Sequence, residues 1–209
     1  TDNSHLIPFY KPALDLSYEP YAYQKIAAVS IDAMFGLNDE VERSNILVSS
    51  PTGSGKSFLI QHAALRAAQE NKRLIVGVPL VALAEQTFSS LRSLLKPFEK
   101  ENDREFSKVG IRTGPSEMFP DADILVCTYE IIAINMALSI DFLDNTPVLI
   151  LDEIHYMTDR DRGARVEYIA SSLRDGTGLI GLSGTIPNAP QFAHSMQRCN
   201  GRMTRLIGL

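Results

Sequence analysis

Five short apolar runs set the strongest limit on what this chain can fold into. Each is rich in Ile, Leu and Val and nearly continuous, and together they span residues 46–49, 74–78, 124–127, 148–151 and 179–182. A strand with one face in water alternates apolar and polar residues, whereas a continuous apolar run indicates a strand that is buried on both faces. The runs therefore predict a mainly parallel sheet covered by helices.

Helical patterns lie before and between these runs. They cover residues 20–35, 56–69, 82–95, 130–138 and 165–173. Alternating strands and helices predict an α/β domain of three layers, with right-handed crossovers and helices on both faces of the sheet. We expect this domain to occupy residues 20–209 and to end in a strand near 205–209. Residues 1–19 are expected to form an arm or linker, and the charge run at 99–108 a solvated loop or helix end.

The charge balance argues against one broad class of function. The 209 residues include 20 Lys and Arg and 25 Asp and Glu, which gives a formal net charge of −5. A generally basic nucleic-acid-binding protein is therefore disfavoured, and any polyanion must bind at a local site. The two cysteines, Cys127 and Cys199, are too few for a disulfide framework or a four-cysteine zinc site.

Nothing in the sequence predicts a membrane segment or a signal peptide. The longest apolar stretch, residues 131–140, is interrupted by Asn135 and Ser139 and is too short to span a bilayer. We expect an intracellular protein, with the choice between nucleus and cytoplasm left open. Because the chain begins at Thr1 rather than Met, we expect a fragment of a longer protein.

A glycine-rich segment joins the first apolar run to the helical pattern that follows it. Residues 50–57 read SPTGSGKS. Gly53 and Gly55 permit a tight turn whose N–H groups can point at an anion, and the start of a helix adds partial positive charge. The segment predicts a nucleoside triphosphate site, in which Lys56 contacts the β- and γ-phosphates and Ser57 ligates Mg²⁺.

The residues predicted to bind the nucleotide in this segment are Thr52, Gly53, Ser54, Gly55, Lys56 and Ser57. Ser50 departs from the usual motif, which has Gly at that position. The alternative is a chance match within a loop. A predicted strand before the segment and a predicted helix after it favour the phosphate site.

Two carboxylates follow the fourth apolar run. Residues 147–153 read PVLILDE, so Asp152 and Glu153 end a buried strand. In an open α/β sheet the ligand crevice lies at the carboxyl ends of the strands, where the phosphate loop also falls. Asp152 is therefore the predicted partner of Mg²⁺, and Glu153 the predicted base that orients the attacking water. The alternative is two surface acids that cap the next helix.

These motifs resemble those of the DExH-box helicases of superfamily two. The phosphate loop and DEIH at 152–155 are followed by SGT at 183–185, and the strings DEIHYMTDRDRG and GLSGTIPNAPQFA are most similar to Ski-like RNA helicases. The resemblance extends from about Tyr18 to Phe192. It implies a RecA-like P-loop NTPase domain that uses ATP and Mg²⁺ and binds single-stranded RNA, with DNA left open.

The resemblance also implies roles for single residues. Gln24 would read adenine, His155 would join Lys56, Asp152 and Glu153 in the catalytic set, and the hydroxyls of Ser183 and Thr185 would couple nucleotide state to strand grip. The implied nucleic-acid contacts lie in PLVALAEQ, RTGP and CTYE; they are Pro79, Gln86, Thr113, Gly114, Thr128 and Glu130.

Members of this family work with two RecA-like domains, and this chain resembles the first. The second would supply arginines that stabilise the transferring phosphate, and nothing after Thr185 resembles it; residues 197–205 are expected to be a basic surface segment. We therefore expect this chain alone to bind ATP·Mg²⁺ weakly, to hydrolyse it barely and to unwind nothing. Expected partners are RNA, the second domain and an RNA-processing complex. The alternatives are a DNA-directed helicase, a P-loop NTPase switch that never translocates, and a catalytically dead binding module.

Overall fold

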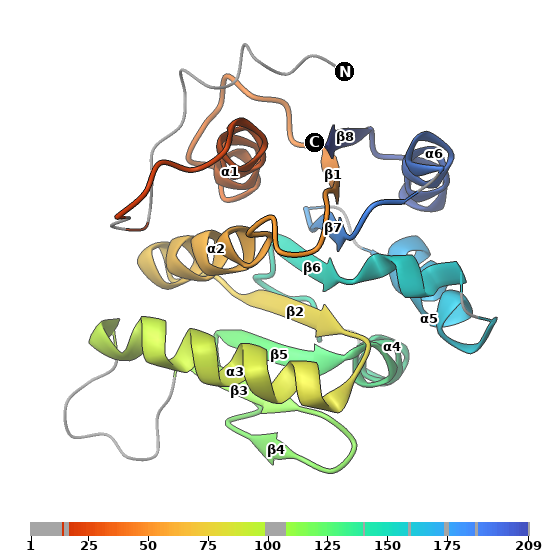
Figure 1. Cartoon of the computed structure of the whole chain (residues 1–209). Coiled ribbons are helices and arrows are strands. Elements are labelled where there is room, and N and C mark those ends of the chain that lie inside the picture. The colour runs from red at the N-terminus through yellow and green to blue at the C-terminus, as the bar shows by residue number, and fades with distance from the viewer. Residues whose placement is uncertain are drawn as a thin grey trace.

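The computed structural model describes residues 14, 17–98, 108–139, 141–158, 160–173, 176–186 and 188–208. Strands and helices alternate along most of this chain (Figure 1). The strands are β1 (Asn45–Ser49), β2 (Leu74–Val78), β3 (Val109–Arg112), β4 (Glu117–Met118), β5 (Ile124–Thr128), β6 (Val148–Asp152), β7 (Gly178–Ser183) and β8 (Thr204–Gly208). The α-helices are α1 (Ala22–Met34), α2 (Ser57–Glu70), α3 (Val81–Leu95), α4 (Tyr129–Leu138), α5 (Arg160–Ser171) and α6 (Ala189–Asn200), with short 3₁₀ turns η2 (Lys96–Phe98) and η3 (Ile154–Thr158).

The strands described form one sheet in the order β4-β3-β5-β2-β6-β7-β1-β8. The pairing of β3 with β4 is antiparallel, and the other pairings are parallel. Because β1, β2, β5, β6 and β7 run in the same direction, their carboxyl ends share one edge of the sheet. The loops that follow them therefore meet at that edge, where an α/β fold binds its ligands.

Two apolar clusters, one on each face of the sheet, form the core. Alternate strand residues belong to opposite clusters: Val76 belongs to the cluster that contains residues of α1, α2 and α3, whereas Ile75 belongs to the one that contains residues of α4, α5 and α6. Figure 1 shows the two groups of helices on opposite sides of the sheet. The predicted three layers and mainly parallel sheet are confirmed, and burial of strand residues on both faces explains why the apolar runs are continuous.

The predicted elements agree with the structure to within a few residues at most boundaries. All five apolar runs are strands, and the final strand is β8. Helix α5 begins at Arg160, five residues earlier than expected. The sequence did not predict its first turns because they are polar and show no apolar spacing. The prediction of a basic surface segment at 197–205 is wrong in part: residues 197–200 are the last turn of α6, Gly201 ends it with φ of +69°, and β8 begins at Thr204.

Strands β3 and β4 and helix α6 were not predicted. The two strands are too short to show a clear period, whereas Ala189, Phe192, Ala193 and Met196 of α6 do have helical spacing and were overlooked. The predicted arm at 1–19 and the charge run at 99–108 lie mostly outside the described residues. None of the helices in the described part of the chain is long and apolar enough to cross a membrane.

Candidate active site

The phosphate-binding loop connects β1 to α2. Gly53 and Gly55 have φ of +79° and +84°, values that residues with a side chain rarely adopt. At Gly55 a Cβ atom would lie 2.8 Å from Nε2 of Gln24, so a side chain here would also displace the Gln24 amide. The loop therefore needs glycine at both predicted positions, and it leads directly into the first turn of α2, where backbone N–H groups have no helical partner.

Lys56 lies at the end of this loop and contacts it. Its Nζ donates hydrogen bonds to the carbonyl oxygens of Ser50, at 2.9 Å, and Pro51, at 3.0 Å. Ser50, which replaces the usual glycine, is buried, and its hydroxyl shares a hydrogen bond of 2.8 Å with that of Ser54. The buried serine hydroxyl thus stabilises the conformation of the loop.

Helix α1 holds the loop from a second side. Gln24 donates from Nε2 to the carbonyl oxygen of Gly55 at 2.9 Å, and its Oε1 accepts the backbone N–H of Tyr21 at 2.8 Å. Gln24 is only 1% exposed, so the residue expected to read adenine lies against the loop with both ends of its amide engaged. Tyr23 was not predicted as a site residue, yet its hydroxyl donates to the carbonyl oxygen of Ser54 at 2.6 Å.

The acidic pair stands at the carboxyl end of β6. Oδ1 of Asp152 accepts the backbone N–H of Glu153 at 3.0 Å, and Glu153 has φ of +55°, in the left-handed region. Burial, reinforced by the negative charge of Glu153, raises the pKa of Asp152 to about 6, although the charge of Lys56 opposes this rise. A carboxylate in such surroundings is one that a cation would stabilise.

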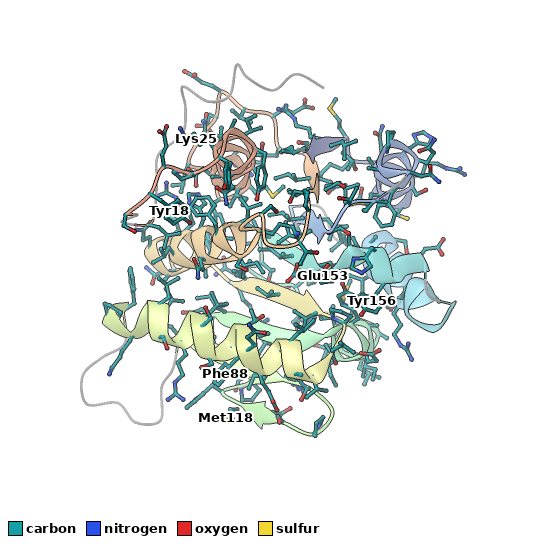
Figure 2. The ribbon with its side chains drawn as sticks, viewed as in Figure 1. Tyr18, Lys25, Phe88, Met118, Glu153 and Tyr156 are labelled. Atoms are coloured by element: carbon teal, nitrogen blue, oxygen red, sulfur yellow. The ribbon has the colours of Figure 1, made fainter. Side chains whose placement is uncertain are left out.

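A pocket of about 240 Å³ brings Ser57, the first residue of α2 after the loop, together with the two acids. Side chains from α2, α3 and the end of β6 line it, among them Ser57, Gln61, Gln86, Asp152 and Glu153. Figure 2 shows Glu153 just past the end of the β6 ribbon, and residues of α2 and α3 line the same pocket. Gln86, which was expected to contact nucleic acid, also lines this pocket.

The donors in this pocket fit Mg²⁺ that shares its ligands with a nucleotide. Within the described ranges, no group of three or more His, Cys, Asp and Glu side chains is placed to hold a metal ion by itself. The hydroxyl of Ser57 and the carboxylate of Asp152 are both oxygen donors, and Mg²⁺ in proteins commonly takes one or two protein oxygens together with phosphate oxygens.

His155 connects the acidic pair to the end of β7. Its Nδ1 lies 3.2 Å from Oε2 of Glu153 and 3.2 Å from the hydroxyl of Ser183, which is fully buried. The loop after Ser183 is joined to β1, because the Ser49 hydroxyl accepts the backbone N–H of Ile186 at 3.1 Å. Thr185 is exposed on this loop. The residues that were expected to couple the nucleotide site to nucleic-acid binding thus lie at contacts between β6, β7 and β1.

The other residues that were expected to contact a nucleic-acid strand lie in the loops after β2, β3 and β5. Pro79, Thr113 and Thr128 are buried, whereas Gly114 is exposed. The Thr113 hydroxyl accepts the backbone N–H of Ser116 at 3.0 Å, which closes the turn after β3. These side chains shape their loops, so an approaching strand would meet backbone groups and Gly114 there.

Two further contacts belong to the loop after β5. Glu130 pairs with Arg165 of α5, with 3.5 Å between Oε1 and Nη1. The fully buried Tyr129 had no predicted role, although it lies within CTYE; its hydroxyl donates to the carbonyl oxygen of Asp152.

Comparison with known proteins supports the predicted resemblance. Superkiller complex protein 2 of Homo sapiens is 29% identical over 206 residues, which is 99% of this chain and 15% of that protein. The ATP-dependent RNA helicase mtr4 of Schizosaccharomyces pombe is 33% identical over 175 residues, 83% of this chain and 14% of that protein. The chain therefore spans about 15% of the length of these curated relatives.

Solved structures support the fold. The UvsW helicase from bacteriophage T4 matches with a TM-score of 0.62 at 22% identity, over 96% of this chain and 63% of that chain. The model of the family described as DEAD/DEAH box helicase matches residues 25–192, from α1 to α6. Since this match covers most of the sequence, the chain belongs to the DEAD/DEAH box helicase family.

Proposed function

We propose that this chain is the ATP-binding motor domain of an ATP-dependent RNA helicase, which couples ATP hydrolysis to movement along a single strand and to duplex unwinding. The observation that carries the proposal is the shared pocket of Ser57, Asp152 and Glu153 beside the phosphate-binding loop. DEAD/DEAH box helicases bind ATP. Because relatives of this chain are named RNA helicases, we propose RNA rather than DNA as its substrate.

The chain's own groups suit each part of ATP hydrolysis. The loop N–H groups and the start of α2 would bind the phosphates, and Lys56 would leave the carbonyls of Ser50 and Pro51 to contact them. Glu153 would orient the attacking water and accept its proton. Ser57 and Asp152 would hold Mg²⁺, which neutralises phosphate charge when bound.

The link between hydrolysis and strand grip would run through His155. Its ring lies between Glu153 and Ser183, so a change at the γ-phosphate can reach the end of β7 and the exposed Thr185. The strand would lie across the loops at Pro79, Gly114 and Thr128, with most contacts made to phosphate and sugar. Such contacts carry little sequence information.

The rest of the motor is part of the same proposal. A second RecA-like domain would close on this pocket and supply arginines, each worth roughly 10³–10⁵ in rate where measured. We therefore expect this chain alone to hydrolyse ATP barely. The full-length protein would act inside the cell as part of a complex, as the name of the Superkiller complex relative suggests. Because another relative is named an RNA helicase, we propose that this complex processes RNA.

The decisive experiment compares RNA with DNA in the full-length protein. We expect single-stranded RNA to raise the ATPase rate more than DNA of the same sequence, and we expect ATP-dependent unwinding of an RNA duplex with a single-stranded overhang. Preferential stimulation by DNA would replace this proposal with a DNA-directed helicase. An ATPase that neither strand stimulates, and that crosslinks to neither near Thr113 and Thr128, would indicate a nucleotide switch.

A further inference from the structure

Tyr129 connects the loop after β5 to the end of β6. It is the first residue of α4, directly after Thr128, and it is fully buried. Its hydroxyl donates a hydrogen bond to the backbone carbonyl oxygen of Asp152. Strand β2 lies between β5 and β6 in the sheet, so the tyrosine side chain reaches across a whole strand.

The Tyr129 side chain crosses β2 at Gly77, which has no side chain to occupy that space. In the sheet register Gly77 is paired with Cys127 of β5 on one side and with Leu151 of β6 on the other. A Cβ atom at Gly77 would lie 3.3 Å from Cδ1 of Tyr129 and 2.7 Å from Cδ2 of Leu151. The missing side chain at Gly77 therefore leaves the space in which the Tyr129 ring and the ends of neighbouring apolar side chains pack over β2.

The peptide that Tyr129 holds is the one that leads into the predicted base. The carbonyl oxygen of Asp152 accepts from Tyr129, and the N–H of the same peptide, on Glu153, donates to the Asp152 carboxylate. Both ends of this peptide plane are therefore fixed. Glu153 follows in a left-handed conformation, at φ of +55°, which a side-chain-bearing residue adopts only where its surroundings impose it.

We propose that Tyr129 is a positioning residue that transmits strand binding to Glu153. The proposal rests on the proposed function, because it assumes that nucleic acid binds at the loop of Thr128 and Glu130. A strand that engages this loop shifts the start of α4. Tyr129 passes the shift to the Asp152–Glu153 peptide, which turns the Glu153 carboxylate toward the orientation needed for hydrolysis.

The test is Tyr129→Phe in the full-length protein, which deletes the hydroxyl and keeps the ring. We expect the RNA-stimulated kcat for ATP to fall about tenfold, the loss that one buried hydrogen bond can cause. The unstimulated kcat should fall by clearly less, because only the stimulated rate includes the shift that Tyr129 transmits. The KM for ATP and the Kd for single-stranded RNA should stay within about twofold, since Tyr129 is buried away from both ligands. Tyr168→Phe, which changes an exposed tyrosine on α5, is the matched control and should leave all four values unchanged.

Each other outcome overturns the proposal. Unchanged stimulation would show that the hydroxyl transmits nothing. An equal loss of stimulated and unstimulated kcat would show fixed positioning without coupling. A parallel loss of ATP affinity, RNA affinity and both rates would show a structural role. If RNA fails to stimulate the wild-type protein, the proposed function fails, and that result is visible before any variant is made.

Discussion

The Lys56 ammonium group donates a hydrogen bond of 2.9 Å to the backbone carbonyl oxygen of Ser50, six residues earlier at the start of the same loop. A second carbonyl, that of Pro51, accepts from it at 3.0 Å. Phosphate oxygens carry full negative charge and are stronger partners for an ammonium group than neutral carbonyl oxygens. A triphosphate is therefore expected to draw Lys56 from these carbonyls, and the loop keeps the lysine close to where it is needed.

Lys56→Ala should weaken ATP binding to the full-length protein about 30-fold or more, because it removes a charged partner of the phosphates. Isothermal titration calorimetry with ATP and Mg²⁺ would measure the change. Lys72→Ala is the matched control, since Lys72 precedes β2 at the opposite edge of the sheet and bonds to Asn145. A similar loss of affinity in both variants would contradict the assignment of Lys56.

Glu153→Gln should separate binding from hydrolysis. The amide cannot accept the proton of the attacking water, so we expect the RNA-stimulated kcat to fall at least about 100-fold, within the range of general-base effects. ATP affinity should change little, because Glu153 is assigned to water and not to phosphate. The exposed Glu167→Gln on α5 provides the control. If Glu153→Gln weakened ATP binding as much as hydrolysis, Glu153 would have to be reassigned as a ligand-binding group.

The raised pKa of Asp152 predicts how cation-dependent nucleotide binding varies with pH. With a pKa of about 6, this carboxyl is mostly ionised at pH 7.5 and mostly protonated at pH 5.5. Only the ionised form can ligate Mg²⁺, so affinity for ATP·Mg²⁺ should fall by about fourfold over this interval beyond the effect of the nucleotide's own titration.

Asp152→Asn supplies the reference for that measurement. The variant should bind ATP·Mg²⁺ more weakly at pH 7.5, and its remaining pH dependence should be that of the nucleotide and of groups shared with the wild type. Titrations of both proteins at several pH values would show whether the two curves converge toward pH 5.5. Parallel curves would show that Asp152 does not titrate in this range or does not hold the cation.

The sheet could be predicted from the sequence because it is built from strands buried on both faces. Residues 74–78 are apolar at every position but Gly77, since they pack on α2 and α3 on one side and on α4 on the other. The phosphate-binding loop was predictable for a different reason, since its glycines have positive φ. Strand β3 was not predictable: it has four residues, one of them Gly110, whose missing side chain leaves room for the carbonyl of Phe119.

Contacts between distant segments carried no signal in the sequence. Gln24 was expected at the nucleotide, and its position against Gly55 depends on how α1 packs beside α2. The hydroxyls of Tyr23 and Tyr129 were missed because their partners are backbone carbonyl oxygens 31 and 23 residues away. A backbone carbonyl is present at every position, so no residue pattern marks such a partner.

Tyr23→Phe should test whether α1 shapes the phosphate-binding loop. The Tyr23 hydroxyl donates to the carbonyl oxygen of Ser54 at 2.6 Å, and the Ser54 hydroxyl is bonded to Ser50, so three side chains hold the loop in one conformation. Without the tyrosine hydroxyl the loop gains freedom that ATP must then remove on binding. We expect the Kd for ATP to rise about threefold to tenfold, because this is the change in affinity that the loss of one hydrogen bond causes. The kcat at saturating ATP should stay unchanged. Tyr21→Phe is the control: Tyr21 is 60% exposed and its ring stacks on that of Tyr23, and this variant should bind ATP as the wild type does. A fall in kcat at constant Kd would place Tyr23 in the chemical step instead, and no change in either value would show that the loop keeps its shape without α1.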